Sequence, residues 1–231
     1  NYKELEQLLA NNLELFKKKY TFNEKGNFEG NNILIENNLE ISREEKNKIR
    51  KLEEILLIER NNRNKPEFDN KSQTDQNCFL LETLLVSSLI TENKPLKLQT
   101  IKDIENIENY LSKKIFHCYQ DTEIDAFLED YVYFASLLIT KYEIDGDELN
   151  INKSKEILIK AWDNFFDKKS GLLQKNKVNE NDLFVQPIDL NDNNIPNGNS
   201  IYLNLCNKLY TITNDKIWLE KIDLLKKSFH Q

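Results

Sequence analysis

The stretch Tyr142-Glu-Ile-Asp-Gly-Asp147 decides the fold, because it closes one apolar helix and opens another. The residues before it, Glu123 to Tyr142, carry apolar and aromatic side chains at helical spacing. The turn residues suit a left-handed helix stop followed by a new N-cap. Leu89-Ile-Thr-Glu-Asn-Lys94 and Tyr210-Thr-Ile-Thr-Asn-Asp215 occupy the same place in their own surroundings. The sequence therefore repeats a helical hairpin with variable loops.

Repeated hairpins bury their apolar faces only by stacking on their neighbours, in a solenoid or a closed toroid. In a toroid the inner helices are more apolar than the outer ones, and this sequence alternates in that way. The alternation favours an all-α fold, an α/α toroid, over a plain bundle. We expect inner helices over 76–90, 123–142 and 200–210, outer helices over 98–116, 152–166 and 215–229, and two earlier helices over Tyr2 to Tyr20 and Arg43 to Asn61.

Composition excludes several classes of protein. The 231 residues carry a net charge of −7, with lysines and glutamates interleaved, whereas a nucleic-acid partner requires a basic face. No stretch approaches the ~20 apolar residues of a membrane span. Cys78, Cys118 and Cys206 form no C-x-x-C pair, which indicates reduced thiols and a cytoplasmic location. The chain begins with Asn and contains no Met, so we expect it to be an excerpt of a longer polypeptide.

Several motifs carry a family resemblance. They are Gly26-Asn-Phe-Glu-Gly-Asn-Asn-Ile-Leu34, Arg60-Asn-Asn-Arg-Asn-Lys-Pro-Glu-Phe-Asp-Asn-Lys71, Phe127-Leu-Glu-Asp-Tyr131, the stretch 142–147 and Pro196-Asn-Gly-Asn-Ser200. In this order they resemble the C-terminal part of the spermatogenesis-associated thioredoxin-like family. The resemblance implies a six-hairpin α/α toroid, similar to those of glycosidases and N-acylglucosamine 2-epimerases. It also implies an upstream thioredoxin-fold domain in the parent chain as a partner.

The resemblance covers most of the chain, so we expect residues 1–231 to form a single portion of the toroid without the thioredoxin-fold domain. About eight predicted helices fall short of six hairpins, so we expect the toroid to be incomplete. The chain also departs from the family pattern. Gln76-Asn77-Cys78 replaces Trp-Asn-Gly, Asn70 replaces an aspartate, and Gln186-Pro187-Ile188 replaces Arg-Pro-Lys. An aromatic platform and two cations are therefore lost.

Asp130 is the first candidate catalytic residue, because it lies near the start of an inner helix, where the helix dipole favours a carboxylate. It could bind sugar hydroxyls or act as a general acid or base. The alternative is that Asp130, together with Glu123, Asp125 and Glu129, only stabilises the first helical turn. Tyr131, its neighbour, is a candidate ligand-binding residue.

Two more candidate catalytic carboxylates, Asp69 and Asp192, could pair with Asp130, since glycoside hydrolysis requires two carboxylates beside the scissile bond. For Asp69 the alternative is a loop ion pair with Lys71. Lys71 itself is a candidate ligand-binding residue, as is Asn77. The histidines give no catalytic pair, since His117 is expected to pack at a helix end and His230 is the penultimate residue.

The loop Pro196-Asn-Gly-Asn-Ser200 predicts a tight turn, with Asn199 or Ser200 as the cap of the next helix. Because that helix is an inner one, Asp189, Asp192 and Asn199 would form a polar rim suited to hydroxyl-rich ligands. The spacing Asp189-x-Asn-x-Asn suggests a calcium loop, but the Gly and the bidentate Glu of an EF-hand are missing. We therefore expect neither a metal nor a cofactor.

Two functions stay open at this point. The first is a carbohydrate pocket, acting as a glycosidase-like or epimerase-like enzyme if it is active at all. The second is a non-catalytic interaction scaffold that accompanies the redox domain of the parent chain. They differ in whether the candidate residues converge in one cleft.

Overall fold

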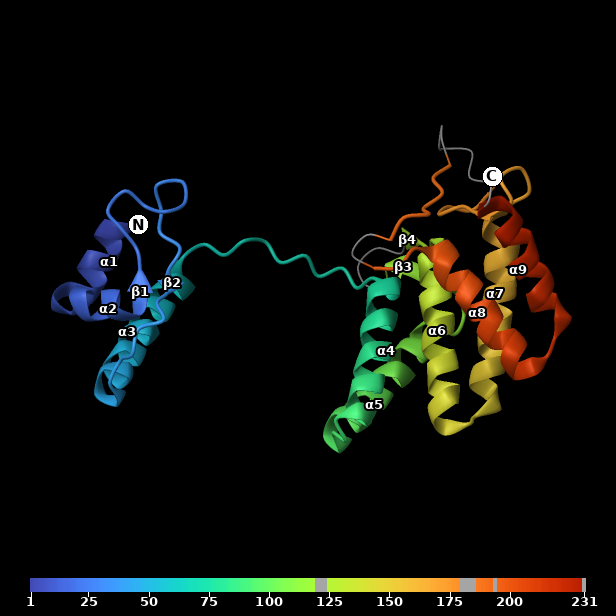
Figure 1. The fold of residues 1–231 in the computed structure, drawn as a ribbon, viewed down its shortest axis with the longest axis horizontal. Coiled ribbons are helices and arrows are strands. Elements are labelled where there is room, and N and C mark those ends of the chain that lie inside the picture. Colours follow the sequence, from blue (N-terminus) through green and yellow to red (C-terminus); the bar gives the residue numbers. More distant parts are fainter. Residues whose placement is uncertain (119–123, 179–185, 193–194, 230–231) are drawn as a thin grey trace. The chain divides into compact units, whose positions relative to one another are not determined.

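The computed structural model describes residues 1–118, 124–178, 186–192 and 195–229 (Figure 1). The chain divides into two compact units, Asn1–Asp69 and Asn70–Gln231. Each unit has its own buried apolar cluster. No helix in the described ranges is both long and apolar enough to cross a lipid bilayer.

The first unit packs around a small core that includes Leu9, Phe16 and Ile49. The prediction of one helix from Tyr2 to Tyr20 is wrong, because Ala10 turns the chain with a φ of 44°. Two asparagines, which are weak helix formers, follow Ala10. The elements are α1 (Tyr2–Leu9), the 3-10 turn η1 (Ala10–Asn12), α2 (Leu13–Lys19), β1 (Tyr20–Thr21), β2 (Ile35–Glu36) and α3 (Arg43–Asn62).

In its described residues, the second unit consists of three helical hairpins and two short strand pairs. Figure 1 shows α6 between α4 and α8, and α6 contacts both of them while each inner helix packs on the helix that follows it. The predicted α/α toroid fold and its inner and outer helices are therefore confirmed. The elements are α4 (Thr74–Ile90), α5 (Lys94–Tyr110), β3 (Phe116–Cys118), β4 (Ile124–Asp125), α6 (Leu128–Asp145), α7 (Glu148–Phe165), β5 (Phe166–Asp167), β6 (Leu172–Leu173), α8 (Gly198–Thr213) and α9 (Lys216–Phe229).

The hairpin turns follow the chemistry predicted from the sequence. Gly146 ends α6 with a φ of 72°, in the left-handed region that glycine adopts at low cost. The side chain of Asp147 then accepts the backbone N–H of Leu149 and caps α7. Asn214 ends α8 with a φ of 55°, and Asn93 caps α5 by accepting the N–H of Leu96.

Several helix boundaries differ from the prediction, among them the start of α7, which lies at Glu148 and not at residue 152. The helix expected from Glu123 begins at Leu128, because Ile124–Asp125 pairs with Phe116–Cys118 as an antiparallel strand. The helix expected over 98–116 spans Lys94–Tyr110, with Pro95 in its first turn, where proline fits. Asp125 therefore lies in a strand, where it pairs with Lys114 at 2.8 Å, and not in the first turn of α6. Glu123 lies outside the described residues.

The core of the second unit centres on α6. Val132, Leu137 and Leu138 on this helix are fully buried, and Tyr202 and Trp218 from α8 and α9 are buried beside the same cluster. Burying a side chain of this size contributes about 1.5–3 kcal/mol. Neighbours on several sides therefore fix α6, which makes its first turn a rigid support for functional side chains.

Candidate functional site

The first turns of α4, α6 and α8 meet at one end of the second unit. The backbone N–H of Asp75 on α4 donates to Asp130 on α6. Gly198 opens α8, and a Cβ there would lie 2.7 Å from the side chain of Leu128 on α6. Only glycine allows α8 to start this close to α6. Three inner helices thus direct their N-terminal ends, with their partial positive charge, to one place.

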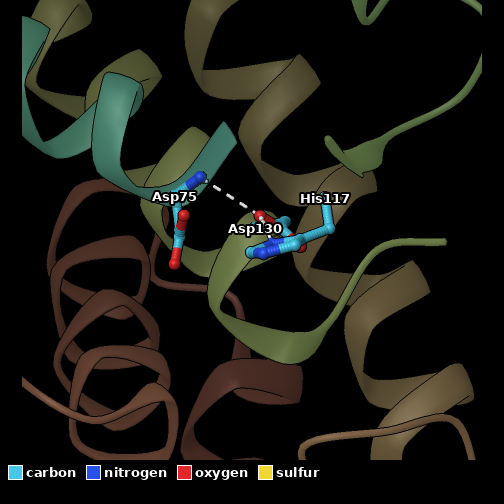
Figure 2. Close-up of side chains that lie close together, drawn as sticks. All are labelled: Asp75, His117 and Asp130. Carbon is cyan, nitrogen blue, oxygen red and sulfur yellow. Dashed lines mark hydrogen bonds and ion pairs between the residues drawn. The ribbon is translucent and has the colours of Figure 1, made fainter. Parts of the chain in front are cut away.

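Asp130 is the centre of this end. Its carboxylate accepts the N–H of Phe127 at 2.8 Å and the N–H of Asp75 at 3.1 Å. Nδ1 of His117 on β3 lies 3.1 Å from both of its oxygens. Figure 2 shows the imidazole ring lying against this carboxylate, with Asp75 close by. Asp130 is completely buried, and it holds the starts of α4 and α6 and the strand β3 together.

His117 is therefore not a packing residue at a helix end, which corrects the expectation from the sequence. Its ring also packs on Phe127, with 4.7 Å between ring centroids, and its Nε2 lies 3.1 Å from the side-chain nitrogen of Gln73. The hydrogen bond to Asp130 raises the pKa of His117 above 6.5. Burial raises the pKa of Asp130, and its bonds to His117 and Phe127 partly offset that rise. An ion pair between the two side chains satisfies both groups.

Asp75, His117 and Asp130 are also the described residues that could hold a metal ion, since one ligand atom from each lies within 4.8 Å of the others. One imidazole and two carboxylates would suit zinc or manganese. However, three donors already occupy Asp130, and Asp75 accepts the N–H of Gln76 at 2.7 Å. A metal would have to displace these hydrogen bonds, so the geometry favours the ion pair.

Glu129 is the functional candidate that sequence reasoning passed over as a mere helix-stabilising acid. Its Oε2 is buried and has no hydrogen-bond partner among the described residues. A Cβ at Gly198 would lie 3.0 Å from its Oε1, so the start of α8 covers this carboxyl group. Burial raises the pKa of Glu129, and Lys175 lowers it in part. The signal in the sequence was its place beside Asp130, at the start of an inner helix that is largely buried.

The loop before α8 caps that helix, as the sequence predicted, but a different residue is the cap, and the predicted tight turn is wrong because Gly198 is the first residue of α8. Asn197, and not Asn199 or Ser200, is the N-cap, accepting the N–H of Ser200 at 2.9 Å. Asp192 accepts from the backbone and the side chain of Asn197, at 2.9 and 2.8 Å. The carbonyl oxygen of Pro196 accepts the hydroxyl of Tyr133 at 2.7 Å, which ties this loop to α6.

Two other residues of the predicted polar rim also have identified partners. Asn199 is 1% exposed and binds the backbone of Leu173 in both directions, at 2.9 and 2.8 Å. It therefore fixes β6 to α8. Asp189 is half-exposed, and Lys175 lies 3.7 Å from its carboxylate. Asp189 and Lys175 both act electrostatically on Glu129, so they belong to the same end of the unit.

Lys71 and Asn77 line one pocket of about 630 Å³ together with Gln73, Gln76, Phe79, Leu80 and Ile195. Asn77 donates to the backbone oxygen of Gln73 at 2.7 Å. The side chain of Gln73 lies next to His117, so this pocket borders the ion pair of His117 and Asp130. The two predicted ligand-binding residues of this loop and helix are thus brought together.

The remaining predicted residues lie elsewhere. Tyr131 faces a separate pocket between α5, α6 and α7, although it follows Asp130 directly in the chain. Asp69 is exposed and is the last residue of the first unit. The structure therefore gathers Asp130, Asp189, Asp192, Asn199, Lys71 and Asn77 at or beside the start of the inner helices, and separates Tyr131 from them.

The comparisons give structural neighbours and no sequence family. No protein-family model and no curated protein sequence matches the chain. The similar solved structures include two inactive variants of the α-1,6-mannanase GH76A of Salegentibacter sp. HEL1_6. One contains α-1,6-mannotriose and is 18% identical, with a TM-score of 0.52. The other contains α-1,6-mannotetrose and is 17% identical, with the same TM-score.

Each alignment covers 81% of this chain and 54% of the mannanase, so the chain spans about half the length of that enzyme. At this identity the similarity establishes a shared fold alone, the α/α toroid. No comparison supports the resemblance to the thioredoxin-like family.

Proposed function

We propose that the second unit is a carbohydrate-binding or carbohydrate-processing toroid domain whose ligand binds at the N-terminal ends of α4, α6 and α8. The observation that carries this proposal is Glu129, a buried carboxyl group with an unpartnered oxygen among the described residues. It stands next to Asp130 on an inner toroid helix. We propose the same function for residues 1–231 taken together, because the structural similarity to the mannanase covers 81% of the chain.

The mannanase neighbours support this location. In both inactive variants two consecutive aspartates are replaced, and mannooligosaccharides are bound. Glu129 and Asp130 are likewise consecutive carboxylates in this chain. Hydroxyl-rich ligands suit an end of the molecule that presents carboxylates, asparagines and helix N–H groups.

The two carboxylates would have different tasks. A carboxyl group with a raised pKa is better suited to protonate a leaving oxygen, and burial raises the pKa of Glu129. Asp130 is fully buried and already accepts three donors. We therefore assign Glu129 to the ligand and Asp130 to positioning, through His117 and the first turn of α6. Asp192 stays our candidate for the second carboxylate, whereas Asp69 belongs to the first unit and is left out of this site.

The test is ligand-observed NMR with α-1,6-mannotriose and the full chain. Glu129→Gln keeps the shape of the side chain, removes its charge and should abolish saturation transfer to the sugar. Glu148→Gln is the matched control, because Glu148 is an exposed acid in the first turn of α7. Transfer that persists unchanged in the Glu129→Gln variant would remove Glu129 from the site, and no transfer from the folded chain would defeat the proposal for this sugar.

A second candidate function is an interaction scaffold that accompanies an upstream thioredoxin-fold domain in the cytoplasm. Hydrogen bonds within the fold already occupy Asp130 and Asn199, two of the predicted site residues, and this observation supports the scaffold. Three buried free thiols, Cys78, Cys118 and Cys206, support a reducing compartment. A purified thioredoxin-fold partner that binds the chain while mannotriose does not would favour this function.

A further inference from the structure

A second cavity opens between α5, α6 and α7. Its volume is about 400 Å³, within the range of small-molecule sites. Residues Lys71, Gln73 and Asn77 are not among those that line it. It is therefore a different place in the second unit from the N-terminal ends of α4, α6 and α8.

The floor of this cavity is apolar. Leu111, Ile115, Tyr131, Phe134 and Ile157 line it, and none of these side chains is more than 9% exposed. The hydroxyl of Tyr131 accepts from Asn164 at 3.4 Å. Such a floor offers a hydrocarbon or aromatic group a place out of water and offers few partners for sugar hydroxyls.

The rim of the cavity is basic. It holds four lysines and two glutamates, a formal excess of two positive charges on a chain whose net charge is −7. The lysines are Lys113, Lys114, Lys153 and Lys160, of which Lys114 pairs with Asp125 outside the lining. The sign of the local charge is thus opposite to that of the chain, which favours an anionic ligand.

One of the two glutamates of the rim, Glu108, is already paired with lysines. Glu108 is largely buried, and Lys141 binds it at 3.0 Å from outside the cavity lining. Lys153 stands 3.6 Å from its other oxygen. Lys113 and Lys160 form no ion pair with any residue of the described ranges. Two exposed ammonium groups are therefore placed to meet an incoming anion.

We propose that this cavity binds a small amphiphilic anion, namely an organic carboxylate with an apolar body. The apolar body occupies the floor formed by α6, α7 and the segment after α5, and the carboxylate meets Lys113 and Lys160 at the rim. Both parts of the ligand are required, because a surface ammonium group alone holds an anion weakly. This site is independent of the proposed carbohydrate site.

Isothermal titration of the full chain with octanoate tests the proposal, with octanol as the uncharged analogue. We expect saturable binding of octanoate, weaker binding of octanol, and a roughly fourfold loss of affinity for each methylene removed from the chain. Raising the salt concentration should weaken the binding of octanoate more than the binding of octanol. Equal affinities for octanoate and octanol would overturn the role of the lysines in binding an anion. No saturable binding of octanoate would overturn the proposed site as a whole.

Charge reversal at the rim locates the site. Lys160→Glu should weaken octanoate binding by roughly threefold to tenfold, and Lys113→Glu should act in the same direction. Lys216→Glu is the control, because Lys216 is an exposed lysine at the start of α9, outside the cavity lining. Octanoate affinity that is equal in all three variants would contradict the assigned place. Binding of mannotriose should not change in Lys160→Glu, which separates this result from the carbohydrate proposal.

Discussion

Replacing Asp130 by Asn tests whether this carboxylate holds the end of the second unit together. The carboxylate accepts two backbone N–H groups and the imidazole of His117, and it is completely buried. An amide in its place has one acceptor oxygen, so its NH₂ group would face a donor on at least one side. Hydrogen bonds to a charged group contribute about 1.5–3 kcal/mol each, and breaking a buried pair costs about 3–5 kcal/mol.

We therefore expect Asp130→Asn to lower the free energy of unfolding of the second unit by about 3–5 kcal/mol. Urea titration followed by tryptophan fluorescence measures this unit alone, because both tryptophans, Trp162 and Trp218, belong to it. Asp125→Asn is the matched control. It removes an exposed carboxylate that pairs with Lys114 on the surface, so it should cost about 1 kcal/mol or less.

A loss in Asp130→Asn no larger than that in Asp125→Asn would refute the reasoning. It would mean that the buried network contributes little once the desolvation of Asp130 is included.

Three further predictions concern the same unit. The pKa of His117 is raised in the folded state, so above pH 6.5 the folded chain binds more protons than the unfolded chain. The free energy of unfolding should therefore be highest below that pH and fall as the pH rises through the folded pKa. His117→Gln should flatten this fall in urea titrations from pH 6 to 9. Gly198→Ala should lower the free energy of unfolding by about 1–3 kcal/mol, because the new Cβ would press on Leu128. Gly146→Ala should also lower it, but only because alanine is strained at a φ of 72°, since no atom lies near the new Cβ. Burial raises the pKa of the Cys78 and Cys206 thiols, so a thiol reagent should label neither cysteine before urea unfolds the unit. Labelling of the folded chain as fast as that of an exposed thiol would contradict their burial.

Local signals in the sequence predict the hairpins of this fold well. Apolar residues at helical spacing and the turn at Gly146 and Asp147 act over a few neighbours, so they are visible in a linear chain. The inner position of α6 followed from its apolar composition. The start of α6 did not, because strand β4 at Ile124–Asp125 has only two residues, and its partner strand ends six residues earlier.

The site was harder to predict, because its contacts join distant segments. Asp130 and His117 are thirteen residues apart, and Asp75 is fifty-five residues from Asp130. No spacing rule brings them together. Asp130 could be singled out from its place at the start of an inner helix, but the donors that surround it could not. The unpartnered oxygen of Glu129 is likewise a property of packing, since the start of α8 covers it.

The most direct test of the account maps the sugar onto the chain. Backbone amide spectra of the full chain should be recorded as α-1,6-mannotriose is added. We predict that the amides that shift belong to the first turns of α4, α6 and α8, among them Asp75, Glu129 and Asn199. Shifts confined to the cavity around Lys160, or no shifts at all at saturating sugar, would contradict a carbohydrate site at the start of the inner helices.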